Sequence, residues 1–226
     1  MRVCEAIWLQ KRMLALGAAE GSPLAHIGSS TAEFREKRKP HIEQLLFTPL
    51  KAAGFEIVHI DIKDEPGVDM IGDLTDPLFQ AELRQRGFKS AICANLLEHL
   101  ENPSAIAAAC EEIVGVGGHV LATAPYSYPY HPDPIDTLYR PSPTELATIF
   151  SRSAFIEGEV LVDGGLVGEE ARKGWRHLAL YPLAATKRLI SVAWAPRTAY
   201  AQAHRLLWLV RNFKVSCCHL KVERLS

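Results

Sequence analysis

Two histidines and an aspartate stand where they could carry out acid–base chemistry. His99 follows the apolar run 88–94, while His131 and Asp136 lie in the aromatic segment that follows a second apolar run, 119–124. Histidine titrates near neutral pH, so it can remove a proton from a hydroxyl or an amine. An aspartate can orient an imidazole or accept a hydrogen bond from a sugar hydroxyl. We therefore predict His99, His131 and Asp136 as the catalytic candidates.

Each of these side chains also has a structural interpretation, which the sequence leaves open. His99 could bond the backbone of the neighbouring loop, and His131 could lock its own loop through Asp136 or Arg140. Arg140 could bind an acidic acceptor, but we expect it to form a buried ion pair with Asp136.

The predicted elements would bring these residues to one edge of a sheet. The run 88–94 is typical of a buried parallel strand, and 119–124 of a second one. Between them, Asn102 is a good N-cap and Pro103 suits the first position of a helix that ends at the glycine-rich turn 115–118. A strand, a helix and a strand in this order form a right-handed crossover, and ligands lie beyond the carboxyl ends of its strands.

Three further strands are predicted upstream. They cover 23–28, 55–60 and 68–71, and a helix over 43–53 precedes the second of them. Asp61 comes directly after that second strand. In a nucleotide-binding α/β fold, an acidic residue at this point can accept hydrogen bonds from both ribose hydroxyls.

The order of motifs resembles the second half of class I methyltransferases that use S-adenosylmethionine, in the methyltransferase type 11-like branch. That branch carries E-H-x-x-(D/N)-P, a G-G turn before a strand, and a P-x-x-Y-P-x-H-x-x-P-x-D run followed by an arginine. Here these motifs stand at 98–103, at 117–118 and at 125–140. The resemblance covers about residues 24–163. It implies an α/β fold: a Rossmann-like, doubly wound, mostly parallel seven-stranded sheet with helices on both faces.

The resemblance also implies a set of cofactor-binding positions. Asp73, after the third strand, matches the residue that faces the adenine amino group. At the glycine motif the chain departs from G-x-G-x-G, because Gly28 is followed by Ser29 and Ser30. These serines could present backbone and hydroxyl donors to the carboxylate of the cofactor, which has no pyrophosphate. The implied cofactor is S-adenosylmethionine, bound by Gly28, Ser29, Ser30, Asp61, Asp73, Leu74 and Asn95.

The function implied by the resemblance is O- or N-methylation of a small molecule or a glycan. Two alternatives stay open. The single glycine of the turn 27–31 motivates a non-catalytic protein that keeps the fold as a binding or scaffolding module. A nucleotide-dependent enzyme on a related sheet is the other, although G-x-G-x-x-G is lacking. The sequence does not distinguish a sugar hydroxyl, a phenol, an amine or a carboxylate as the acceptor.

Two segments lie outside the resembling part. Residues 3–19 suit an amphipathic helix, which could be a lid over the cofactor cleft but which we expect to pack on the sheet. Residues 164–213 are predicted to form a helical insertion or cap before the last strand. The methyltransferase-like α/β domain is then made of 1–163 and 214–226.

The insertion is rich in basic residues and tryptophans. Between 173 and 214 this pattern fits peripheral contact with an anionic membrane, and the alternative is a cap that packs on the domain or forms a homodimer. We favour the cap.

The composition limits which binding partners and which cellular compartment we expect. A net charge of −1 argues against a general nucleic-acid surface. We expect a cytoplasmic protein, peripheral at the membrane if the insertion binds lipid, because neither a spanning apolar run nor a signal peptide is evident. The five cysteines are odd in number and lack metal-ligand spacing, so we predict reduced thiols and no metal site.

Overall fold

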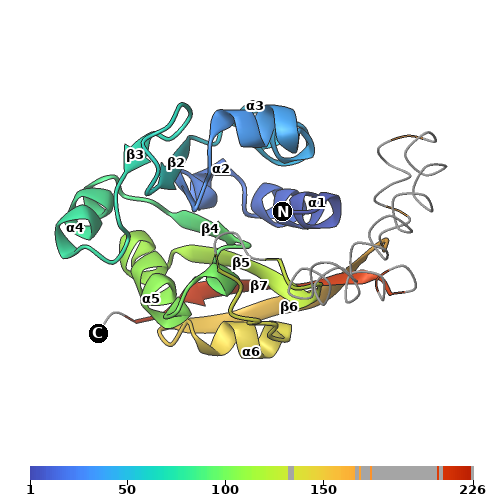
Figure 1. The fold of residues 1–226 in the computed structure, drawn as a ribbon. Coiled ribbons are helices and arrows are strands. Elements are labelled where there is room, and N and C mark those ends of the chain that lie inside the picture. Colours follow the sequence, from blue (N-terminus) through green and yellow to red (C-terminus); the bar gives the residue numbers. More distant parts are fainter. Residues whose placement is uncertain (132–134, 166–167, 169–173, 175–207, 209–210, 225–226) are drawn as a thin grey trace.

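The protein is built around one seven-stranded sheet with the order β3-β2-β1-β4-β5-β7-β6 (Figure 1). The computed structural model describes residues 1–131, 135–165, 168, 174, 208 and 211–224. The strands are β1 Leu24–Ile27, β2 Ile57–Asp61, β3 Met70–Ile71, β4 Ser90–Ala94, β5 His119–Ser127, β6 Ser153–Asp163 and β7 Phe213–Val222. Strands β1 to β5 pair in parallel, and β7 runs antiparallel to both β5 and β6. The predicted fold class, a mostly parallel Rossmann-like sheet, is confirmed.

Helices cover both faces of this sheet. The α-helices are α1 Val3–Leu16, α2 Ala18–Gly21, α3 Thr48–Ala52, α4 Pro77–Gln85, α5 Pro103–Val114 and α6 Pro143–Thr148. Two π-helices, η1 Phe34–Arg38 and η2 Glu43–Phe47, precede α3, and a 3-10 helix, η3 Leu97–His99, follows β4. In Figure 1, α1 and α3 lie on one side of the sheet, and α4, α5 and α6 on the other.

The core is divided into two layers by the alternation of the strands. Leu9 and Met13 of α1 pack with Ile92 and Leu121 of the sheet in one cluster. The neighbouring strand positions turn the other way, into a second cluster that contains α4 and α5 residues such as Leu83. Because α1 buries its apolar side here, the expectation that this helix packs on the sheet is confirmed.

Local signals decided where α5 begins and ends. The side chain of Asn102 accepts a hydrogen bond from the Ala105 N–H at 3.2 Å, and Pro103 occupies the first turn. The helix stops at Gly115, whose φ of 69° is a left-handed conformation that favours glycine. Both predicted boundaries are confirmed.

Other boundaries follow from pairing partners rather than from local sequence. The predicted strand 119–124 continues to Ser127 because β7 pairs with it as far as Ser127 and Lys214, across a register shift after Pro125. The predicted helix 43–53 is divided into η2 and α3. The predicted insertion 164–213, with its membrane and dimer hypotheses, falls almost entirely outside the described residues.

Among the described residues, no helix is both long enough and apolar enough to cross a membrane. All five cysteines are free, and four of them are buried.

Candidate functional site

The carboxyl ends of β1, β2 and β4 meet at one edge of the sheet. Ile27 of β1 is in register with Ile60 of β2 and with Cys93 of β4. The residues that follow these strands therefore lie side by side, as a parallel sheet requires. We call this region the strand-end edge; it consists of the turn 28–30 with Asp61, Asp73, Leu74 and Asn95.

The turn after β1 is fixed against β2. Gly28 has a φ of 65°, a left-handed conformation that favours glycine, and a Cβ at this position would also crowd Cδ2 of Leu96 at 3.0 Å. The Ser29 N–H donates to the Ile60 carbonyl at 3.1 Å, and the Ser30 N–H donates to Oδ2 of Asp61 at 2.7 Å. The Ser29 hydroxyl donates to the Ser30 carbonyl. These donors, expected to face a ligand, hold the turn itself.

A buried arginine that the sequence analysis did not single out completes this turn. Arg35 of η1 is only 3% exposed, and its guanidinium donates to the carbonyls of Ser29 (3.0 Å), Ser30 (2.6 Å) and Gly67 (2.7 Å). It thereby ties the turn after β1 to the segment before β3. The charged run that contains it is typical of a solvated surface, so no local signal distinguishes Arg35 from its neighbours.

Two aspartates of the edge keep acceptor capacity. Within the described part of the chain, Oδ1 of Asp61 accepts only the Lys63 N–H, at 3.2 Å. Oδ1 of Asp73 accepts from the backbone and the hydroxyl of Thr75, and these bonds lower the pKa of Asp73. Its Oδ2 accepts no hydrogen bond from any described residue. Leu74 is buried beside it, and its carbonyl accepts from Gln80.

The N-terminal helix closes the edge with a buried carboxylate. Asn95 adopts a φ of 51°, and its side-chain amide donates to Oε1 of Glu5 at 2.7 Å. The Thr123 hydroxyl donates to the same oxygen at 2.7 Å, and the Arg2 N–H donates to Oε2 at 2.6 Å. Glu5 is fully buried. It was missed by the sequence analysis, since one glutamate in an amphipathic helix carries no signal.

The two catalytic-candidate histidines are brought together. The rings of His99 and His131 lie 5.2 Å apart between centroids, at 82°. Nδ1 of His99 lies 2.5 Å from the carbonyl of Ile135, which is the backbone contact considered as its structural role. Nδ1 of His131 lies 3.2 Å from the carbonyl of Pro129, and burial lowers the pKa of His131.

Asp136 holds the loop that carries His131. Its carboxylate accepts from Arg140 at 3.0 and 2.6 Å, from the His131 N–H at 2.9 Å and from the Leu138 N–H at 2.9 Å. Burial acts to raise the pKa of Asp136, but the hydrogen bonds from Arg140 and the two N–H groups outweigh it and lower the pKa to about 2. The expected ion pair with Arg140 is therefore present. Oδ2 also lies 3.2 Å from Nδ1 of His131.

Glu98 is the unusual side chain of this region. It is 1% exposed, and neither carboxylate oxygen has a hydrogen-bond partner in the described part of the chain. Burial raises its pKa to about 7. Nε2 of His99 lies 3.7 Å from its Oε1. We call Glu98, His99 and His131 the Glu98 cluster; the sequence analysis noted Glu98 only as part of a motif.

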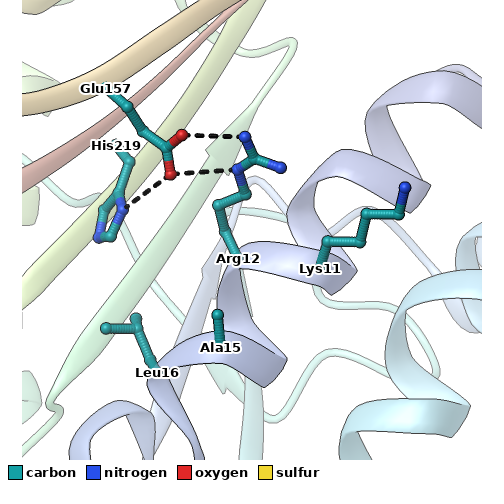
Figure 2. Close-up of a pocket in the computed structure, with 6 residues that line it drawn as sticks. All are labelled: Lys11, Arg12, Ala15, Leu16, Glu157 and His219. Carbon is teal, nitrogen blue, oxygen red and sulfur yellow. Dashed lines mark hydrogen bonds and ion pairs between the residues drawn. The ribbon is translucent and has the colours of Figure 1, made fainter.

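A separate hollow lies between α1 and the β6–β7 pair, and none of the residues discussed above lines it. Its volume is about 260 Å³, and Figure 2 shows Arg12 pointing across it to Glu157. The guanidinium donates twice to that carboxylate, at 3.1 and 2.9 Å, and His219 lies 3.8 Å from it. Lys11 points away from this group in Figure 2. Because the charges already pair with each other, we assign the hollow a structural role.

No protein-family model and no curated protein matches the sequence. Solved structures do match. A candidate sarcosine dimethylglycine methyltransferase from Galdieria sulphuraria has a TM-score of 0.57 at 8% identity, with 98% of this chain and 85% of that chain covered. A candidate methyltransferase from Bacillus halodurans C-125 has a TM-score of 0.54 at 12% identity, covering 95% of this chain and 99% of that one.

Coclaurine N-methyltransferase, solved with N-methylheliamine and SAH, has a TM-score of 0.54 at 10% identity, with 97% of this chain and 70% of that chain covered. Sequence identities this low are evidence of a shared fold alone. Together with the strand order and the antiparallel β7, they show that this chain has the fold of class I S-adenosylmethionine-dependent methyltransferases.

Proposed function

We propose that this protein is an S-adenosylmethionine-dependent methyltransferase that acts on a hydroxyl or amine of a small molecule or glycan. The observation that carries the proposal is the strand-end edge. Asp61 is the last residue of β2, and Asp73 and Asn95 follow β3 and β4, in a fold whose solved neighbours include a methyltransferase bound to SAH.

The residues of the edge fit the adenosine part of such a cofactor. A carboxylate offers about four lone-pair sites, and Asp61 uses two of them on Ser30 and Lys63. The remaining sites suit a pair of ribose hydroxyls, and Oδ2 of Asp73 suits an amino group. The fit is weaker at the methionine end, because the Ser29 and Ser30 N–H groups already bond within the protein.

Bound S-adenosylmethionine would supply an electrophilic methyl group. The protein's task is then to align an acceptor, exclude water and take up the acceptor's proton. We assign proton uptake to the Glu98 cluster, which lies beyond the carboxyl ends of β4 and β5. Asp136 and Arg140 do not take up the proton themselves; they hold the loop that carries His131 in place.

Calorimetric titration with S-adenosylmethionine and SAH tests the proposal. We expect micromolar binding that Asp61→Ala abolishes and that Asp64→Ala, a change at an exposed neighbour, leaves intact. At a hundredfold excess of ligand over Kd, thermal or urea unfolding should show about 2.7 kcal/mol of stabilisation. Binding that is equal in the two variants would contradict the assigned cofactor site.

A non-catalytic binding module is the second candidate. It is favoured by the internal hydrogen bonds of the turn after β1 and by Glu5, which engages the side chain of Asn95. Absence of binding to either ligand would support it. Stabilisation by NAD or a nucleotide sugar instead would point to the nucleotide-dependent enzyme.

The partners of residues 173–214 stay a separate prediction. Flotation of the protein with anionic liposomes tests membrane contact, and light scattering tests the homodimer. Failure to float would remove the membrane hypothesis without touching the proposed reaction.

A further inference from the structure

Three side chains with metal-binding atoms converge outside the strand-end edge. Glu98 and His99 lie in η3 after β4, and His131 lies in the loop after β5. Because β4 and β5 are parallel neighbours, their following loops meet. One ligand atom from each residue of the Glu98 cluster lies within 4.8 Å of the others. Two imidazoles and a carboxylate are a donor set suited to Zn²⁺, Fe²⁺ or Mn²⁺.

Among the described residues, the carboxylate of Glu98 has no hydrogen-bond partner. Glu98 is 1% exposed, and both its oxygens lack a hydrogen bond from the described residues. A buried carboxylate without a hydrogen bond or counter-charge is costly, and native proteins rarely keep one without a reason. Nε2 of His99 lies 3.7 Å from Oε1 of Glu98, beyond hydrogen-bond distance. Among the described residues the carboxylate therefore has no hydrogen-bonded counter-charge, which a bound cation would supply.

The hydrogen bonds of the two imidazoles leave a lone pair on each. Carbonyl oxygens only accept, so the contact between Nδ1 of His99 and the Ile135 carbonyl places the proton on Nδ1 and the lone pair on Nε2. Nδ1 of His131 faces two acceptors, the Pro129 carbonyl and Oδ2 of Asp136, both at 3.2 Å. Its lone pair is likewise on Nε2.

This arrangement is the usual outer shell of a metal-bound histidine. Metal-ligating imidazoles donate their second N–H to a carbonyl or carboxylate, which fixes the tautomer and the ring orientation. Asp136 is itself held by Arg140 at 2.6 Å. With metal–ligand distances near 2.1 Å, tetrahedral ligand atoms lie roughly 3.4 Å apart. The 3.7 Å between His99 and Glu98 is close to that spacing.

We propose that Glu98, His99 and His131 form a binding site for one divalent transition-metal cation. The sequence analysis expected no metal, because it weighed only the cysteines. Three protein ligands leave a coordination position open for water or an acceptor oxygen, and a bound cation lowers the pKa of a coordinated hydroxyl. With the cation bound, the lone pairs of the Glu98 cluster are occupied, so activation of the acceptor by the cation replaces proton uptake by these side chains. That role toward an acceptor rests on the proposed function, and it favours an oxygen acceptor over an amine. Metal binding itself does not depend on the proposed function.

Metal titration of the full chain tests the site. Protein freed of metal with EDTA is titrated calorimetrically with Zn²⁺ and Mn²⁺, and with Co²⁺ followed by visible absorption. We expect one equivalent of metal per chain. Glu98→Gln should weaken binding at least about tenfold, while Glu101→Gln, an exposed glutamate two residues from His99, should bind like the wild type. A Co²⁺ spectrum without thiolate charge-transfer bands would exclude the cysteines as ligands.

A second variant helps to distinguish loss of a metal ligand from misfolding of the protein. His131→Gln removes one imidazole and leaves the backbone N–H that bonds Asp136, and circular dichroism with thermal melting in EDTA checks each variant. No saturable binding to the wild type, or equal binding to the wild type and Glu98→Gln, would overturn the proposal. None of these measurements contains S-adenosylmethionine. If the protein binds metal but not the cofactor, the metal site is supported and the proposed function is contradicted.

Discussion

The strand-end edge and the Glu98 cluster adjoin each other, but they differ in whether their buried polar groups have hydrogen-bond partners within the protein. At the edge, Glu5 accepts three hydrogen bonds and Arg35 donates three, all from within the protein. In the cluster, Glu98 accepts none from the described residues. Satisfied buried groups stabilise a single conformation, whereas an unsatisfied one is a cost that a ligand can remove. The edge is thus largely complete without a ligand, and the cluster is not.

Of the changes that test this comparison, removing Glu5 should have the largest effect on the free energy of unfolding. Glu5→Ala leaves the Asn95 amide, the Thr123 hydroxyl and the Arg2 N–H without their acceptor, at a cost of about 3 kcal/mol in the free energy of unfolding. Urea denaturation measures it. Glu20→Ala, an exposed glutamate on α2, should cost far less. Equal stability of the two variants would show that the edge is not held by Glu5.

Acid should weaken the β1–β2 part of the molecule next. His26 and His59 are buried with their Nδ1 atoms 3.0 Å apart, a contact that needs one proton and one lone pair. Burial lowers the pKa of His59 to about 4, with the nearby Arg35 and Lys51 acting in the same direction and Asp69 against them. Burial, with the neighbouring His59, also lowers the pKa of His26 well below its usual value.

The direction in which stability changes with pH follows from proton binding to the folded and unfolded states. The unfolded histidine takes up a proton near pH 6.5 and the folded one near pH 4, so stability is complete above 6.5 and falls as the pH drops towards 4. Between pH 6.5 and 5 we expect a loss of about 2 kcal/mol from His59. Urea denaturation in EDTA at several pH values checks it. His59→Leu should flatten this slope, and an unchanged slope would assign it to other groups.

Neutralising Glu98 should have the smallest effect on folding. Without metal, Glu98→Gln replaces a buried carboxyl that has no hydrogen-bond partner among the described residues and whose pKa burial raises to about 7. We therefore expect a change under about 1 kcal/mol, in the direction of greater stability at pH 7. Urea denaturation in EDTA, alongside Glu5→Ala, makes the comparison direct. A loss as large as that of Glu5→Ala would mean that Glu98 does have a structural partner, and the contrast between the two regions would fail.

The predictable parts of the site were those with local causes. Asp61, Asp73 and Asn95 were placed at strand ends because apolar runs stop there. The structure puts Asp73 and Asn95 after β3 and β4, while Asp61, expected just after the second strand, is the last residue of β2. Asn102 and Gly115 marked the limits of α5 by capping preferences that act within one turn of helix. The ion pair of Asp136 with Arg140 spans four residues and could also be anticipated.

The sequence by itself determined the order of elements and the polar residues that follow the strands, because burial periodicity, caps and turns act over a few residues. Only the tertiary structure decided which of those groups are satisfied. Arg35 reaches Gly67, Glu5 reaches Asn95 and Thr123, and His131 comes to His99 and Glu98 because parallel pairing brings distant loops to one edge. Hydrogen bonding and desolvation depend on these distant neighbours, so the contrast between a completed edge and an unpaired carboxylate exists only in the folded chain.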